Sequence, residues 1–212
     1  MQNEYYFSIR VTQEQIDLAK ELVEYSLIHH PISNIWDDNN KSKTSKLRFT
    51  GTLGEIIFSD LYKLKRPTRS FGAIDGQDYG KDFEINIGNQ TMNFDIKTMH
   101  RESNRFYKNY VLNIPARNVN RKDSLTDYYY CLSLHEESNY STASVLGYVK
   151  KDSIRNGKVG ILYSKGSKRV RSNGTSFTFF EDTYEIIFED IITPLISKRI
   201  ETLNSFIKYR LK

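Results

Sequence analysis

The sequence predicts a mixed α/β (α+β) fold in which helices flank a central mixed β-sheet. Apolar residues follow helical spacing over residues 12–29 and 45–64, then change to a period of two over residues 82–87 and 91–98. Short apolar runs separated by turn residues follow as far as residue 188. The 212 residues contain only 11 Gly and 4 Pro and show no internal repeat, so we expect a single domain over residues 1–212.

The first helix is expected over residues 12–29. Thr12 and Gln15 form a T-x-x-Q capping box at its start, and Pro31 ends it. The segment 32–45 is polar, so we expect an exposed loop there.

A second helix is expected over residues 45–64, with its apolar side toward the sheet. It contains Gly51 and Gly54, and a glycine in a helix interior costs about 1 kcal/mol relative to alanine. A close approach to another element is therefore expected at these glycines. Gly51 or Thr50 could also let backbone amides approach a phosphate.

Residues 82–87 and 91–98 each alternate with a period of two, and Gly88 and Asn89 between them are typical of a hairpin turn. After the hairpin, a short helix is expected at 151–156 and a closing helix, or two, over 190–212. The further strands are expected at 110–114, 127–134, 143–149, 160–163, 175–180 and 184–188.

Composition excludes several classes of protein. The single cysteine, Cys131, cannot form an internal disulfide and fits a reducing compartment. No run approaches the roughly 18 apolar residues of a membrane span, and the first ten residues lack a secretory signal, so we expect no membrane partner and a cytoplasmic location. The net charge of +5 allows a nucleic-acid partner without requiring one.

The predicted hairpin brings chemistry-bearing residues together. Asp95 and Lys97 share one face of their strand, because alternate residues of a strand point the same way, while Phe94 and Ile96 point into the core. Asp82 begins the preceding strand and comes within reach of Asp95. Alternatively, Asp95 and Lys97 form an ordinary surface ion pair, which contributes about 0–1 kcal/mol.

Two carboxylates a few ångströms apart repel each other, and a divalent cation relieves that repulsion. Mg²⁺ prefers oxygen ligands and commonly uses one or two carboxylates. Such a cation can orient a phosphate and activate water, and Lys97 could contact the phosphate or assist the attacking water. A neighbouring cation can also lower the pKa of a lysine below its usual value of about 10.4.

The spacing Asp82 … Asp95-Ile96-Lys97 resembles the signature of the PD-(D/E)XK nuclease superfamily, the fold of many restriction endonucleases. The segment Gly51-Thr52-Leu53-Gly54-Glu55 is similar to the first-helix segment of that superfamily. The resemblance covers residues 46–98 well and extends more weakly to residue 150. It implies a restriction endonuclease-like core at 46–150, with 1–45 and 151–212 as elaborations.

Carried over residue by residue, the resemblance implies that Asp82, Asp95 and the backbone carbonyl of Ile96 bind Mg²⁺, or Mn²⁺ as a substitute. It implies that Glu55 holds a metal-bound water or a second metal, and that Lys97 assists the nucleophile. Lys81 stands where the motif has proline, which leaves Asp78 or Asp75 as alternatives to Asp82.

Basic residues near these positions are candidates for DNA contacts. The segment 164–174 could enter a groove and read bases, or could be an exposed hairpin loop. The candidate DNA-binding residues are Lys43, Lys46, Arg48, His100, Arg101, Arg105, Lys168, Arg169 and Arg171.

The resemblance implies a Mg²⁺-dependent endodeoxyribonuclease acting on double-stranded DNA, foremost a sequence-specific type II restriction endonuclease from a prokaryotic, phage or mobile-element context. A palindromic target would call for a homodimer, and a methyltransferase acting on the same DNA site is an open question. The alternatives are a structure-specific, homing or repair-type nuclease of the same fold, or a nucleic-acid-binding module without catalysis.

Overall fold

The computed structural model describes residues 5–29, 38–69, 80–87, 89–101, 111–170, 174–192 and 207–210, and the statements below refer to these. It confirms a mixed α/β architecture. The helices are α1 (Gln13–His29), α2 (Asp38–Tyr62), α3 (Ala116–Asn120), α4 (Lys151–Arg155) and the 3₁₀ helix η1 (Phe188–Asp190). The strands are β1 (Tyr5–Arg10), β2 (Phe83–Ile87), β3 (Gln90–Arg101), β4 (Val111–Pro115), β5 (Tyr128–His135), β6 (Thr142–Lys150), β7 (Ile161–Tyr163), β8 (Lys168–Val170), β9 (Ser176–Thr178), β10 (Thr183–Ile187) and β11 (Ile207–Arg210).

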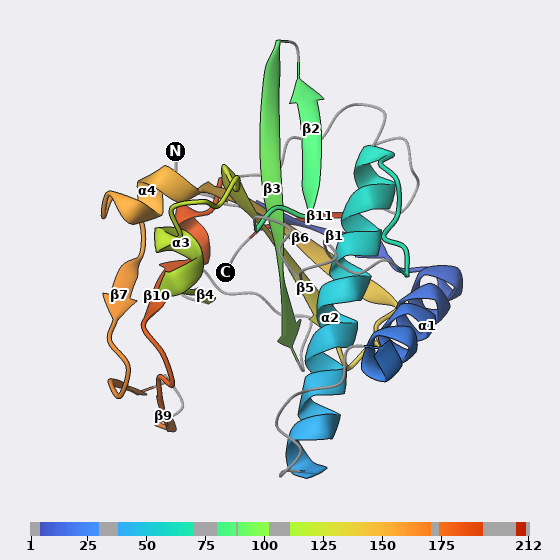
Figure 1. Ribbon diagram of the computed structural model, residues 1–212, viewed down its shortest axis with the longest axis horizontal. Helices are drawn as coiled ribbons and strands as arrows, with labels where there is room; N and C mark the ends of the chain where they lie inside the picture. The colour runs from blue at the N-terminus through green and yellow to red at the C-terminus, as the bar shows by residue number, and fades with distance from the viewer. Residues whose placement is uncertain are drawn as a thin grey trace.

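The main sheet has six strands in the order β11-β1-β6-β5-β3-β2. The β3–β5 pair is parallel, and the other neighbours are antiparallel, so the sheet is mixed as expected. A second sheet has the order β4-β10-β7, and β8 and β9 form a separate two-stranded ribbon. The long β2–β3 hairpin projects beyond the rest of the main sheet (Figure 1).

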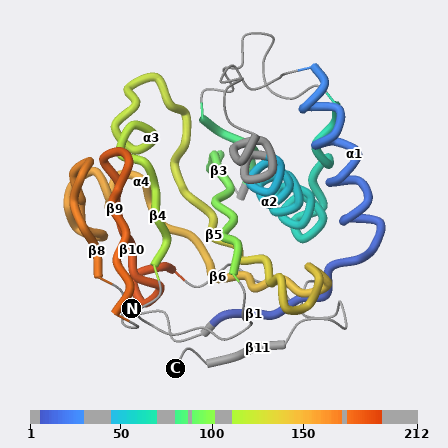
Figure 2. Tube along the Cα trace, turned by 90° about the horizontal axis from the view of Figure 1, so that it is seen from below, coloured from blue at the N-terminus to red at the C-terminus, as the bar shows by residue number. Residues whose placement is uncertain are grey.

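The main sheet lies between two layers (Figures 1 and 2). Helices α1 and α2 cover one face, and α3, α4 and the β4-β10-β7 sheet cover the other. The core on the α1–α2 side includes Leu22, Leu53, Phe58, Ile96 and Leu132. The core on the opposite side includes Leu112, Val119, Tyr129, Ile154 and Phe188.

The capping box at the start of α1 is confirmed. The Thr12 amide donates to Gln15 Oε1 at 2.9 Å, and the Gln15 amide donates to Thr12 Oγ1 at 3.2 Å. These two bonds satisfy amide groups that the first helical turn leaves without partners. The predicted stop at Pro31 lies outside the described residues.

The structure explains why α2 contains a glycine at position 54. A Cβ atom at this position would overlap the side chain of Thr98 on β3, whereas a Cβ at Gly51 would meet nothing within 4 Å. Gly54 therefore permits the close approach of α2 to the sheet, as expected, and Gly51 has no such role.

Two expectations for the secondary structure are wrong, and one strand was not expected. The polar segment 32–45 is not all loop, because α2 begins at Asp38. The N-terminal segment forms β1, which lacks clean alternation in the sequence. The C-terminal region contains a strand, β11, which pairs with β1, and Ile192 forms a bridge with Tyr148. These pairings with distant partners override a helical pattern that is only local.

Candidate active site

The site lies along β3 just beyond Phe94, next to the residue that precedes the first residue of β2. The β2–β3 ladder runs from Ile87 opposite Gln90 to Phe83 opposite Phe94, and β3 then continues to Arg101. Asp82 extends the pairing by one step, because its amide donates to the Phe94 carbonyl at 2.8 Å. Its carboxylate Oδ2 accepts from the amide of Ile96 at 2.6 Å. Asp82 is thus held beside Asp95, as the hairpin predicts.

Asp95 and Lys97 lie on the same face of β3, and Phe94 and Ile96 lie in the core on the other face. Lys97 Nζ is 2.6 Å from Asp95 Oδ1, and the two side chains are only 23% and 11% exposed. Their burial distinguishes this ion pair from a surface pair, in which both charges remain in water. The pair is therefore held in place by the sheet.

The fourth residue of the predicted set, Glu55, comes from α2. It follows Gly54, whose close approach to Thr98 sets the distance between helix and strand. The negative charges of Glu55 and of Asp95 both act on the carboxyl group of Asp82. Helix and hairpin therefore bring Glu55, Asp82, Asp95 and Lys97 into one electrostatic cluster.

The environment of this cluster raises the pKa of Asp82. Burial raises the pKa of its carboxyl group well above the ordinary value, and the charges of Glu55 and Asp95 raise it further. The amide of Ile96 and the ammonium of Lys97 act in the opposite direction without cancelling the rise. The carboxyl group of Asp82 is therefore biased toward its protonated form, and a bound cation would relieve the same repulsion.

The donor set suits a hard cation, because it consists of carboxylate oxygens and contains no sulfur or imidazole. Among the described residues, no group of three or more His, Cys, Asp or Glu side chains is arranged so that it could hold a metal ion. Lys97 pairs with Asp95 instead. Metal binding by Asp82, Asp95 and the Ile96 carbonyl stays a prediction, and the alternatives Asp75 and Asp78 lie outside the described residues.

Two residues that the sequence reasoning did not single out border the site. Tyr129 on β5 lies opposite Asp95, is fully buried, and its ring centroid is 5.7 Å from Lys97 Nζ. Lys151 is 2% exposed, and its pKa is lowered by burial first and by Arg155 next. Asp95 is among the charges that act on it. In the sequence, the features that could have indicated these two residues are the Tyr-rich run at 128–130 and the adjacent Lys150 and Lys151.

The basic residues near the site differ in how they are engaged. Lys46 on α2 and His100 on β3 both approach Glu136, at 3.2 Å and 3.0 Å. Arg48 donates to Ser26 Oγ at 2.7 Å and so connects α2 to α1. Arg101 donates to the Val111 carbonyl at 2.9 Å and stacks over Phe188, which places it between β3 and the second layer.

The segment 164–174 is partly a strand, β8, which pairs with β9. Arg169 binds the buried carboxylate of Glu185 on β10 at 3.0 Å, so this side chain anchors the ribbon to the second sheet. Lys168 is exposed. The side chain of Lys43, and Arg105 and Arg171 altogether, lie outside what the structure describes.

Comparisons with protein-family models, with curated proteins and with solved structures found no match for this chain. The described residues include no helix that is long and apolar enough to cross a membrane.

Proposed function

We propose that this protein is a Mg²⁺-dependent endodeoxyribonuclease with a restriction endonuclease-like core. One observation carries the proposal: Asp82, Asp95 and Lys97 meet at the edge of β3, with Glu55 acting on them from α2. This is the set of residues that the resemblance to PD-(D/E)XK nucleases selects. The finer proposal is a type II restriction endonuclease that cuts double-stranded DNA as a homodimer.

The fold arrangement supports the proposal. Helix α2, the β2–β3 hairpin and the parallel strand β5 form one continuous unit around the site. Apart from the first residues of α2, which begins at Asp38, they lie within residues 46–150, the span proposed as the core. The neighbouring elements α1, β10 and the β8–β9 ribbon lie outside that span and are available for target recognition.

Each residue has a role that follows from its position. Asp82 and Asp95 present carboxylate oxygens to a cation, which when bound would polarise the phosphate and activate water. Lys97, which pairs with Asp95 in this structure, would contact the scissile phosphate or the attacking water once a cation neutralised that carboxylate. Glu55 would hold a metal-bound water or a second metal.

The test is digestion of a supercoiled plasmid with Mg²⁺, with Mn²⁺ and with EDTA. We expect cleavage in either metal and none in EDTA, and we expect Lys97→Ala to abolish it. Lys158→Ala removes an exposed lysine between α4 and β7 and serves as the matched control. Undiminished cleavage by Lys97→Ala would overturn the proposal. Discrete bands would support sequence specificity, whereas cleavage confined to branched substrates would support a structure-specific nuclease.

A nucleic-acid-binding module without catalysis is the second candidate. The observation that favours it is the short Lys97–Asp95 pair, in which the lysine neutralises one of the carboxylates proposed to bind the cation. This candidate predicts DNA binding that persists in EDTA and no product in any divalent metal. Product in Mg²⁺ excludes it.

A further inference from the structure

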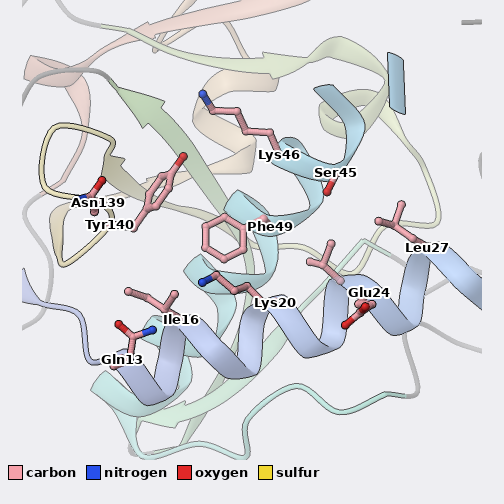
Figure 3. A pocket seen from close by; sticks show the side chains of 11 residues that line it. Gln13, Ile16, Lys20, Glu24, Leu27, Ser45, Lys46, Phe49, Asn139 and Tyr140 are labelled. Atoms are coloured by element: carbon pink, nitrogen blue, oxygen red, sulfur yellow. The ribbon is translucent and has the colours of Figure 1, made fainter. Parts of the chain in front are cut away.

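A groove of about 850 Å³ lies between α1, the N-terminal half of α2 and the β5–β6 turn (Figure 3). This volume is within the range of about 300–1,000 Å³ that is typical of small-molecule sites. Its floor is apolar, formed in part by Ile16, Val23 and Leu27 of α1. None of the residues proposed for catalysis lines it.

Two aromatic rings form one wall. Phe49 of α2 and Tyr140 of the β5–β6 turn lie 5.2 Å apart between centroids, at an interplanar angle of 71°. Tyr140 has φ +63° and the preceding Asn139 has φ +49°, a conformation that non-glycine residues seldom adopt. The turn thus holds the Tyr140 ring against the groove in a backbone conformation that a free loop would avoid.

Two lysines flank this wall, and Figure 3 shows Lys46 above and Lys20 below the Phe49 ring. Lys20 is exposed and has no ion-pair partner among the described residues. Lys46 pairs with Glu136, but the two side chains are 44% and 48% exposed. Such an exposed pair contributes little, so Lys46 can exchange Glu136 for a phosphate at small cost.

The groove adjoins the strand that carries the proposed catalytic residues. His100 lies three residues beyond Lys97 on β3, and its Nε2 is 3.0 Å from Glu136 Oε2. Its ring centroid is 6.0 Å from that of Tyr140. His100 shares its face of β3 with Ile96, whereas Asp95 and Lys97 lie on the other face, so the groove is separate from the proposed catalytic residues.

We propose that this groove binds a single-stranded segment of nucleic acid, with a base against Phe49 and Tyr140 and its phosphates at Lys20 and Lys46. Aromatic rings combined with flanking cations are the chemistry by which proteins hold single-stranded nucleic acid. The choice of ligand rests on the proposed nuclease function. The groove itself is defined by α1, α2 and the turn.

Binding in EDTA tests the proposal without any need for catalysis. The probe is a fluorescein-labelled oligothymidylate of about 8 nucleotides, measured by anisotropy at several salt concentrations. We expect Phe49→Leu to weaken binding by about fivefold or more, because stacking on an aromatic side chain contributes strongly for each base. We expect Lys20→Gln to weaken binding and to lower the salt slope by about 0.7, the value for one phosphate of a single strand.

The matched control is Lys158→Gln, which removes an exposed lysine outside the groove and is expected to leave binding unchanged. Thermal unfolding of each variant separates loss of the groove from loss of the fold, and Lys20→Gln keeps the test valid if Phe49→Leu does not fold. Absence of binding by the wild type, or equal binding by well-folded Phe49→Leu and Lys20→Gln proteins, overturns the proposal.

The outcomes test the groove proposal and the nuclease proposal separately. Plasmid cleavage by the wild type together with unchanged oligonucleotide binding by the groove variants would refute the groove alone. Weakened binding by those variants in a protein that cuts nothing would refute the nuclease alone.

Discussion

Two carboxylates on α2, five residues apart, lie in opposite electrostatic settings. Asp60 accepts two hydrogen bonds from Arg66, at 2.7 Å and 3.0 Å, and a third from Gln15 of α1 at 2.6 Å. Glu55 instead joins Asp82 and Asp95 in a cluster whose nearest ammonium is that of Lys97. Asp60 therefore has hydrogen-bond donors from its own chain, whereas Glu55, Asp82 and Asp95 bring three carboxyl groups to one ammonium group.

Asp60 belongs to a network that stabilises the fold, whereas Glu55 belongs to the candidate active site. The Asp60 network connects the start of α1 to the segment after α2, and Arg66 extends it by binding Glu14 at 2.5 Å. Its hydrogen bonds are complete within the chain, so it stabilises the fold. The repulsion among the carboxylates around Asp82 makes the fold less stable unless a proton or a cation neutralises it. Proteins retain such unfavourable interactions mainly at functional sites.

Asp82→Asn should produce the largest effect. Asparagine keeps an oxygen that accepts from the Ile96 amide but removes the charge. We expect cleavage to fall by at least about 100-fold, because even outer-shell partners of a metal contribute about 10–100-fold. We also expect unchanged or higher stability toward urea in EDTA. A variant that cuts normally, or that is markedly less stable, would contradict the contrast drawn here.

Gly54→Ala tests the contact that positions Glu55. The added methyl group overlaps Thr98, and overpacking of this kind typically costs about 1–3 kcal/mol. Gly51→Ala is its matched control, because the same methyl group there meets nothing within 4 Å. We expect the control to stabilise the protein by up to about 1 kcal/mol through helix propensity. Urea denaturation of both variants measures the difference, and equal effects would refute the close-approach role of Gly54.

Asp60→Asn should lower stability and leave cleavage unchanged, the opposite of what we expect for Asp82→Asn. It weakens charge-assisted hydrogen bonds to Arg66, which are worth about 1.5–3 kcal/mol in general, and one acceptor oxygen remains, so we expect a loss of about 1.5 kcal/mol. Cleavage measured well below the unfolding temperature should stay near the wild-type rate. Loss of activity in a folded variant would show that the two settings are coupled.

The smallest effect is a pH dependence of stability in EDTA. Folded Asp82 binds its proton more tightly than the unfolded chain, because burial, Glu55 and Asp95 raise its pKa. Stability should therefore fall as pH rises from about 4 through the raised pKa, with a slope of at most about 1.4 kcal/mol per pH unit for one proton. Asp82→Asn should reduce this slope, and Mg²⁺ should stabilise the wild type above that window. Urea titrations across pH that give the same slope for both proteins would contradict this account.

Local pattern was sufficient for the hairpin and for most of the site. The alternation at 82–98 places Asp95 and Lys97 on one face, and the structure has them there at 2.6 Å. The capping box of Thr12 and Gln15 is local in the same way. These features depend on residues that are close in the sequence, so spacing alone predicts them.

Features that depend on distant partners escaped prediction. The helical pattern expected after residue 190 gives way at Ile207–Arg210, because that segment completes a sheet edge beside β1. The guanidinium of Arg101 lies between β3 and β4, and that of Arg169 binds Glu185 of β10. A basic residue in a sequence does not reveal whether its partner is a phosphate or a buried carboxylate elsewhere in the chain.

The pairing of β11 with β1 has a consequence for synthesis of the protein. Tyr5 lies opposite Arg210, so this edge of the main sheet joins residues from opposite ends of the described chain. During translation β1 emerges long before β11, so its outer neighbour in the sheet is missing until residues 207–210 have been made. Contacts of such long sequence separation slow folding and leave a strand edge open to other chains. We therefore expect nascent chains paused before residue 207 to depend on chaperones more than the released protein does.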